Sequence, residues 1–434
     1  MSREIGFWVI ALSLSLVFVG YVQADWPQYR GPNGDGRIDE SLPQVSWSEE
    51  GPQFVWNIGT PLGFSSFSVA DGMAVTLISR DEEGDARHEV CLMLDALTGK
   101  PLWERTFGSS KYEHGGGDAG APGNRGGDGP RSTPTIHEGR IYVYDAHLLL
   151  TCMEATSGKI LWQQDIAKDF EGKNITWKNA ASPVIVGDMV CVPGGGPGKA
   201  FLAFDHRSGE LVWHSGNEAM THATPVVTPI SGTNQLVFFA QSGLVGVDPR
   251  DGEELWHAPF DYRTSTAASP VVERDFVYCS AGYGVGAGVF QISRSDQGFS
   301  ADEVWLMNNK LMNHWSTPVV RDGFLYGIYG FKEYGDAPLQ CVELETGKVQ
   351  WSQEGFGQGN CILVGEHLIV LSDDGRLVIV EAQPNAYVEL TNVQAVSGKC
   401  WSTPAYNDGL VYVRSTVEGA CLRLGELPIG DAQR

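Results

Sequence analysis

The feature that most constrains the fold is a pattern that recurs along the chain: an acidic residue, three residues, glycine, three more residues and tryptophan. It occurs five times with the same internal spacing. Repetition of this kind indicates stacked copies of one structural unit rather than a series of unrelated domains. The five copies are Asp95-Gly99-Trp103, Glu154-Gly158-Trp162, Asp205-Gly209-Trp213, Asp248-Gly252-Trp256 and Glu343-Gly347-Trp351.

A second mark, Ser or Thr followed by Pro, sets the number of units. Its successive copies are 49, 42, 45, 48 and 86 residues apart, and the last interval leaves room for one degenerate unit near Cys361. A further unit opens the array, where Phe64 to Phe67 aligns with Trp315 to Pro318. The sequence therefore predicts eight units. The marked prolines are Pro134, Pro183, Pro225, Pro270, Pro318 and Pro404.

Each unit contains four short runs rich in Val, Ile, Leu, Tyr and Phe, separated by Gly, Asp and Pro. Residues 317–351 are an example. Such runs are typical of strands joined by tight turns, and the repeated glycine fits a turn that requires positive φ. A four-stranded repeat of about 40–50 residues is typical of a propeller blade. We therefore predict an all-β, eight-bladed β-propeller of four-stranded antiparallel blades over residues 45–427.

The last unit indicates how the ring closes. Residues 399–427 resemble the first three strands of a unit but lack the final strand with its tryptophan. A matching strand, Gln53 to Trp56, occurs before the first complete unit. We expect residues 45–60 to supply the outer strand of the eighth blade, so that the N- and C-terminal strands share this blade.

The repeated tryptophans are interpreted as structural contacts between blades. Their identical position in every unit favours this role over ligand binding, and a buried indole contributes a large apolar area. The predicted set of docking residues is Trp56, Trp103, Trp162, Trp213, Trp256 and Trp351.

The N-terminal residues predict an exported protein. Residues 1–24 combine Arg3, a long apolar run and a small residue, Ala24, before Asp25, as a cleaved signal peptide does. A membrane anchor is the alternative for this run. After its removal we expect no transmembrane segment, a leader at residues 25–44 and a tail at residues 428–434. With 53 acidic and 30 basic residues the net charge is −23, which disfavours nucleic acid as a partner.

The repeat resembles that of the pyrroloquinoline-quinone-type propellers. This family includes the quinoprotein alcohol dehydrogenases and the periplasmic scaffold of the outer-membrane barrel assembly machinery. The resemblance implies the fold over almost all of the mature chain but no particular activity, because one scaffold hosts unrelated functions.

The residues of the family's enzymes are not matched here. The resemblance implies, for an enzyme, a quinone held between a tryptophan and a disulfide of adjacent cysteines, a calcium ion and a catalytic aspartate. None of the eight cysteines is adjacent to another, and no CxxCH motif for haem is present. We expect no catalytic residue, no cofactor and no bound metal, and interpret the cysteines as small apolar core residues.

Propeller geometry places the candidate site where the loops that enter the inner strands converge. Trp315 and Trp401 are candidates for stacking on a flat ligand, and His222 and His314 for polar contacts. Solvated loop residues without a ligand are the alternative for the whole set. The candidate residues are Phe64, Arg131, Lys178, Asn179, His222, His314, Trp315, Asn360 and Trp401.

Three hypotheses for function follow. The first is an exported, monomeric, non-catalytic scaffold in the periplasm or outside the cell, which binds an envelope protein or a small ligand. The second is a quinone-dependent alcohol or sugar dehydrogenase with a divergent site that holds pyrroloquinoline quinone and calcium. The third is a carbohydrate-binding module that uses the same aromatic mouth.

Overall fold

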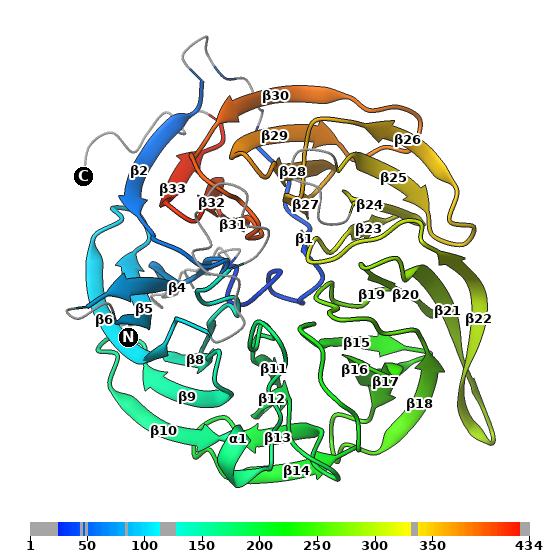
Figure 1. Cartoon of the computed structure of the whole chain (residues 1–434). Coiled ribbons are helices and arrows are strands. Elements are labelled where there is room, and N and C mark those ends of the chain that lie inside the picture. The colour runs from blue at the N-terminus through cyan, green and yellow to red at the C-terminus, as the bar shows by residue number, and fades with distance from the viewer. Residues whose placement is uncertain are drawn as a thin grey trace, which may run out of the picture.

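Eight β-sheets are arranged radially around a central axis in the computed structural model (Figure 1), which confirms the predicted propeller. Each blade runs from an inner strand near the axis to an outer strand at the rim. In the described part of the chain the single helix, α1, has four residues, Ile166–Asp169, and no helix is long and apolar enough to cross a membrane. The structure describes residues 25–43, 47, 51–82, 86–112, 127–330 and 337–425.

Blades 1 to 4 follow the chain in order, and each has four antiparallel strands. Their strands are β3 Ser68–Ala70, β4 Met73–Asp81, β5 Arg87–Asp95 and β6 Pro101–Ser109; β7 Thr135–His137, β8 Arg140–Tyr144, β9 Leu149–Glu154 and β10 Ile160–Asp165; β11 Val184–Val186, β12 Met189–Pro193, β13 Phe201–Asp205 and β14 Leu211–Ser215; and β15 Val226–Ile230, β16 Thr233–Ala240, β17 Gly243–Val247 and β18 Glu254–Pro259.

Blades 5 to 8 complete the ring, and blade 7 is the degenerate unit expected near Cys361. Their strands are β19 Val271–Glu273, β20 Phe276–Ala281, β21 Gly286–Ser295 and β22 Gly298–Asn308; β23 Val319–Arg321, β24 Phe324–Ile328, β25 Leu339–Glu343 and β26 Val349–Gln353; β27 Asn360–Val364, β28 His367–Leu371, β29 Arg376–Glu381 and β30 Glu389–Gln394; and β31 Ala405–Asn407, β32 Leu410–Arg414 and β33 Glu418–Arg423, with β2 Gln53–Gly59 as outer strand.

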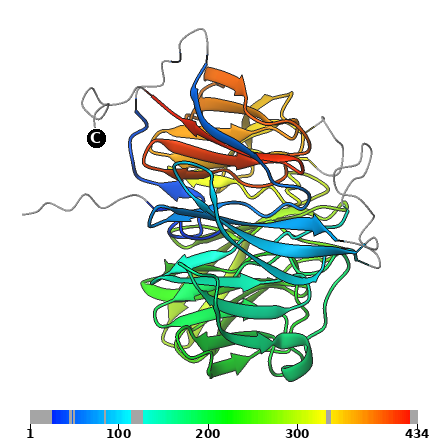
Figure 2. The same ribbon diagram turned by 90° about the vertical axis from the view of Figure 1, so that its left-hand side faces the viewer.

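Blade 8 closes the ring as predicted. The strand β2 pairs antiparallel with β33, with Trp56 opposite Cys421 and Gly59 opposite Glu418. Figure 2 shows β2, from the start of the chain, lying beside β33, from its end. Closure leaves the two ends of the propeller joined by backbone hydrogen bonds instead of two open sheet edges.

The repeat motif joins each blade to the one before it. The indole Nε1–H of Trp103 in blade 1 donates to the carbonyl oxygen of Ala155 in blade 2 at 2.8 Å. Gly158 of blade 2 lies over the same indole, and a Cβ there would be 2.6 Å from the Trp103 ring. The glycine is therefore required both by its φ of +64° and by the approaching tryptophan.

The other docking tryptophans follow this arrangement, with one exception. Trp56, Trp162 and Trp213 each donate to the residue after the acidic position of the next blade. Trp351 donates to Gln383 of blade 7. Trp256 instead donates to the Gln235 side chain of its own blade.

Blade 5 explains the exception. Its β21 and β22 form one long hairpin that lacks the acid-Gly turn, so Trp256 of blade 4 has no such turn to cover. The outer strand of blade 5 carries Trp305, which the sequence pattern does not mark. Trp305 donates to the carbonyl oxygen of Leu344 in blade 6, the role that the repeat tryptophans have elsewhere.

The Ser/Thr-Pro marks form a belt of hydrogen bonds around the inner end of the blades. The hydroxyl of Thr133 accepts from the backbone N–H of Ser66 at 3.0 Å, and Ser182 accepts from Thr133 at 2.9 Å. Thr224 and Thr317 accept in the same way from blades 3 and 5. These buried hydroxyls fix the inner strands of these blades to their neighbours.

The leader packs inside the ring. Trp26, which is 1% exposed, forms an antiparallel bridge with Val69 of blade 1, and β1, Arg37–Ile38, pairs with β27 of blade 7. Between them Arg30, also 1% exposed, donates to the carbonyl oxygens of Thr317 and Pro318 in blade 6, both at 2.8 Å. Residues 25–38 thereby connect blade 1 with blades 6 and 7 through the centre of the ring (Figure 1).

The sequence also makes predictions about the cysteines and about the two ends of the chain. All eight cysteines are buried and free of disulfides. The signal peptide at residues 1–24, the tail at residues 428–434 and the leader boundary at residue 44 lie outside the described residues.

Candidate functional site

One structural position supplies most of the candidate site: the residue two places before the Ser or Thr of the belt. Phe64, Arg131, His222, Trp315 and Trp401 hold this position in blades 1, 2, 4, 6 and 8. It precedes each inner strand, on the side where outer strands lead into the next blade. We call this side the upper face and the opposite side, with the acid-Gly turns, the lower face.

An aromatic row crosses the centre of the upper face. The ring of Trp401 stacks on Phe64 with centroids 4.8 Å apart, and contacts Trp315 at a tilt of 31° with centroids 4.2 Å apart. His314 and Tyr283 extend the row beyond Trp315, with ring centroids 4.7 and 5.2 Å apart in succession. Because blade 7 separates blades 6 and 8, the contact between the two indoles joins two blades that are not adjacent in the ring.

Two cations flank the aromatic row. The guanidinium carbon of Arg131 lies 5.8 Å from the ring centroid of Phe64, and the Lys399 Nζ lies 4.8 Å from that of Trp401. Both are within the range of cation–π attraction. Trp315 is held by a hydrogen bond of 3.0 Å from its Nε1 to the carbonyl oxygen of Gln358. The upper face therefore combines aromatic and basic groups in a strongly acidic protein.

His222 is held in one tautomer by two hydrogen bonds. Its Nε2 lies 2.9 Å from the carbonyl oxygen of Thr176, which can only accept, so Nε2 carries the proton. Its Nδ1 then accepts from the Ser265 hydroxyl at 2.9 Å. Burial, assisted by the charge of Arg131, lowers the pKa of His222 to about 4. His222 is therefore neutral at pH 7 and fixes the surrounding loops.

The other polar candidates are bonded within the protein. Asn179 is buried and donates to the carbonyl oxygens of Tyr144 and Ala181, at 3.1 and 3.0 Å. Asn360 is buried and donates to the carbonyl oxygen of Trp401 at 2.8 Å, which helps to position the aromatic row. Lys178 is half-buried and lies at φ +65° in the turn before Asn179. None of the three is part of the aromatic row.

A buried acidic cluster lies beside Arg131, and sequence reasoning missed it. Glu89, which is fully buried in β5, accepts from the Tyr112 hydroxyl and from the backbone N–H of Ala146. Burial and the nearby Asp145 raise the pKa of Glu89 well above its usual range. The only sequence signal was an acid at the start of a run of apolar strand residues.

The quinone of the enzyme alternative does not fit these residues. The two mouth tryptophans lie on each other at 4.2 Å, so no further ring can enter between them. Cys400, next to Trp401, is buried and its thiol contacts the carbonyl oxygen of Gly398. The carboxylate of Glu89 is occupied by Tyr112 and Ala146 instead of facing a calcium ion.

Comparison with known proteins gives a family match. The family described as "Outer membrane protein assembly factor BamB" matches residues 87–353. The protein of this name from Shewanella oneidensis is 21% identical over 358 residues, covering 79% of this chain and 84% of the relative.

Two solved structures show the same fold. The quinohemoprotein alcohol dehydrogenase from Comamonas testosteroni superposes with a TM-score of 0.64 at 14% identity, over 95% of this chain and 82% of that one. BamB from Moraxella catarrhalis superposes with a TM-score of 0.57 at 14% identity, over 86% of this chain and 97% of that one. At these identities both likenesses concern the fold alone.

Proposed function

Since the chain belongs to the family of the outer membrane protein assembly factor BamB, we propose that it is an exported, non-catalytic scaffold that binds another protein of the cell envelope through its upper face. The observation that carries this proposal is the aromatic row with its flanking cations. Tryptophan, tyrosine and arginine are the side chains that most often dominate the energy of protein interfaces.

A neighbouring cavity extends the proposed surface. It has a volume of about 620 Å³ and lies between blades 4 and 5, on the upper face. Tyr283 of the aromatic row and Val285 of the cavity wall belong to the same β20–β21 turn, so the two features adjoin. Apolar side chains of a partner would be covered here while its polar groups meet the rim. The cavity is lined by Gln241, Ser242, Pro259, Phe260, Asp261, Tyr262, Val285, Ala287, Leu306 and Asn308.

The partner is expected to be a protein segment with acidic and apolar groups. Acidic side chains suit the half-buried Arg131, and apolar ones suit Trp315 and the cavity. A carbohydrate ligand would bind the same aromatic rings. Photocrosslinking to a polypeptide distinguishes a protein partner from such a ligand. We propose no cofactor for this function.

Site-specific photocrosslinking in the host envelope tests the proposal. A photoreactive amino acid at Phe64 or Tyr262, on the upper face, should capture the same polypeptide. Placed at Leu97, which is 58% exposed on the lower face, it should not. Capture that is equal from both faces, or no capture from the upper face, would overturn the proposal.

Substitution provides the energetic test on the same partner. Trp315→Ala and Arg131→Ala should each weaken binding by about 30-fold or more, as expected for central interface residues. Leu97→Ala is the matched control and should leave the affinity unchanged.

A further inference from the structure

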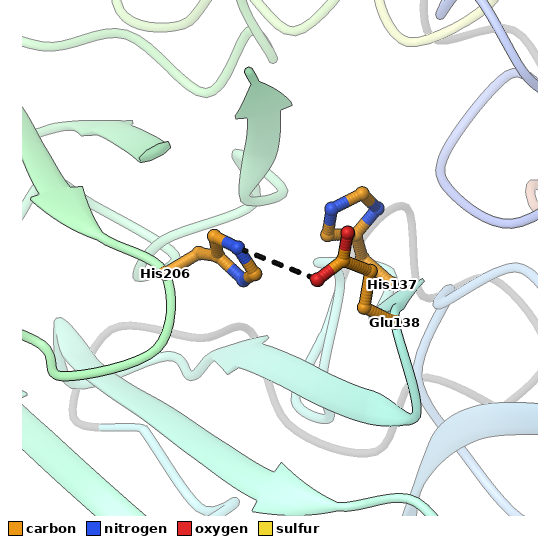
Figure 3. Close-up of side chains that lie close together, drawn as sticks. All are labelled: His137, Glu138 and His206. Atoms are coloured by element: carbon orange, nitrogen blue, oxygen red, sulfur yellow. Dashed lines mark ion pairs between the residues drawn. The ribbon is translucent and has the colours of Figure 1, made fainter. Parts of the chain in front are cut away.

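Three side chains that are distant in the sequence meet on the lower face, away from the surface described above. His137 ends β7, and Glu138 follows it in the turn to β8 of blade 2. His206 lies in the β13–β14 turn of blade 3. Their ligand atoms all lie within 4.8 Å of one another. Figure 3 shows the two imidazoles and the carboxylate directed toward a common point between the blades.

His206 is prepared to accept a ligand through one defined atom. Its side chain is 1% exposed, and the Tyr142 hydroxyl lies 2.9 Å from both its Nδ1 and its carbonyl oxygen. The carbonyl can only accept, so the hydroxyl donates to it and accepts from Nδ1–H. This tautomer leaves Nε2 as an unprotonated lone pair.

That lone pair has no hydrogen-bond partner among the described residues. It lies 3.8 Å from the Glu138 carboxylate and 4.0 Å from that of Asp188, which are both acceptors. A buried lone pair that faces two carboxylates is unfavourable, and a cation between these groups would satisfy all three of them. A metal-binding histidine is typically fixed through its other ring nitrogen, as Tyr142 fixes this one.

We propose that His137, Glu138 and His206 bind a divalent transition-metal ion, of which Zn²⁺ is the representative. Two imidazoles and one carboxylate form a set that Zn²⁺ prefers. Ligand atoms about 2.0–2.1 Å from a tetrahedral ion lie about 3.3 Å apart. The 3.8 Å between His206 and Glu138 needs a small contraction, and the three groups together, whose ligand atoms lie within 4.8 Å of one another, need one of up to about 1.5 Å. The fourth position is left to water or to Asp188, which is on the exposed turn before β12.

The existing ion pair of Glu138 does not prevent this. Arg207 contacts the Glu138 carboxylate at 2.7 Å, but both side chains are more than half exposed, and exposed ion pairs are weak. The bound ion would connect the lower ends of blades 2 and 3, so metal binding is expected to stabilise the ring.

Spectroscopic titration tests the proposal on the mature, untagged protein after removal of metal by a chelator. Co²⁺ should bind one per chain with the visible absorption of a tetrahedral site, and Zn²⁺ should displace it. His137→Gln and Glu138→Gln alter accessible side chains and should each weaken Zn²⁺ binding more than tenfold. Tyr142→Phe should weaken it about 10- to 100-fold through the tautomer of His206.

His214→Gln is the matched control, because His214 is an exposed histidine on β14 of blade 3. Its variant should bind Zn²⁺ as the natural protein does. The proposal is overturned if no metal binds, if His137→Gln and Glu138→Gln bind it unchanged, or if His214→Gln weakens binding as much as they do. Circular dichroism of each variant shows whether the fold is retained.

Discussion

Gly158→Ala tests the contact between the repeat glycine and the tryptophan of the preceding blade. The added methyl group meets two costs. At φ +64° an alanine pays about 1–2 kcal/mol for the left-handed conformation. Its Cβ would also lie 2.6 Å from the Trp103 ring, and such overpacking costs about 1–3 kcal/mol. The expected total loss of stability is about 2–5 kcal/mol.

Gly187→Ala separates the two costs. Gly187 lies at φ +58° in the β11–β12 turn, and a Cβ there meets no atom within 4 Å. It should lose only the backbone contribution of about 1–2 kcal/mol. Urea unfolding followed by far-ultraviolet circular dichroism measures both variants, with no dependence on tryptophan fluorescence.

A double-mutant cycle gives the decisive comparison. Trp103→Ala alone should cost about 3–5 kcal/mol, because it removes a large inter-blade contact. In that background Gly158→Ala should cost no more than Gly187→Ala does, since the clash is gone. If Gly158→Ala costs the same with and without Trp103, or costs no more than Gly187→Ala in the natural chain, the reasoning is refuted.

Three further predictions concern the buried ionisable groups. Arg30→Met should destabilise the protein by about 2–4 kcal/mol in urea unfolding, because it leaves the blade 6 carbonyls unpaired, whereas the exposed Arg274→Met should have no measurable effect. In the folded protein Glu89 keeps its proton above pH 4.5, the ordinary pKa at which the unfolded chain releases it. The contribution of Glu89 to the free energy of unfolding therefore falls as pH rises, by up to about 1.4 kcal/mol per pH unit. Glu89→Gln should therefore gain stability relative to the natural protein between pH 5 and pH 8, and an unchanged difference contradicts this. The expected pH dependence of His222 is the opposite. Its pKa of about 4 lies below the ordinary 6.5, so its contribution to stability is lost as pH falls from 6.5 to 4. The stability of His222→Asn should therefore be less sensitive to acid.

The ring could be predicted from the sequence because its contacts repeat. Five blades share the acid-Gly turn and its indole, and six begin at a Ser/Thr-Pro, so the number of units follows from the spacing of these marks, and the closure follows from the strand that the last unit lacks. Blade 5 shows the limit of this reasoning. Its hairpin lacks the acid-Gly turn, and Trp305 takes the docking role without the motif that marks it elsewhere.

The candidate site could be predicted only where it follows from the repeat. Phe64, Trp315 and Trp401 share one position before the inner strand, and this position brings them together on the upper face. Contacts between residues that hold different positions in the repeat leave no recurring pattern in the sequence. Glu89 of β5 meets Tyr112, which follows β6, and His206 meets Glu138 through two turns of neighbouring blades.

The role of the leader could not be predicted for a similar reason. Its contacts depend on the shape of the closed ring, since Arg30 reaches carbonyl groups that lie 287 and 288 residues along the chain. Only closure brings those groups to the axis. The position of the leader is therefore set by the closed ring of blades, although residues 25–38 carry no copy of the repeat motif.

Native mass spectrometry of the protein released from the envelope of its own host tests the central claim most directly. The account predicts a complex with one further polypeptide, which the Trp315→Ala variant loses, and no quinone in the released chain. A monomer that carries a quinone and a calcium ion, unchanged by Trp315→Ala, would contradict it.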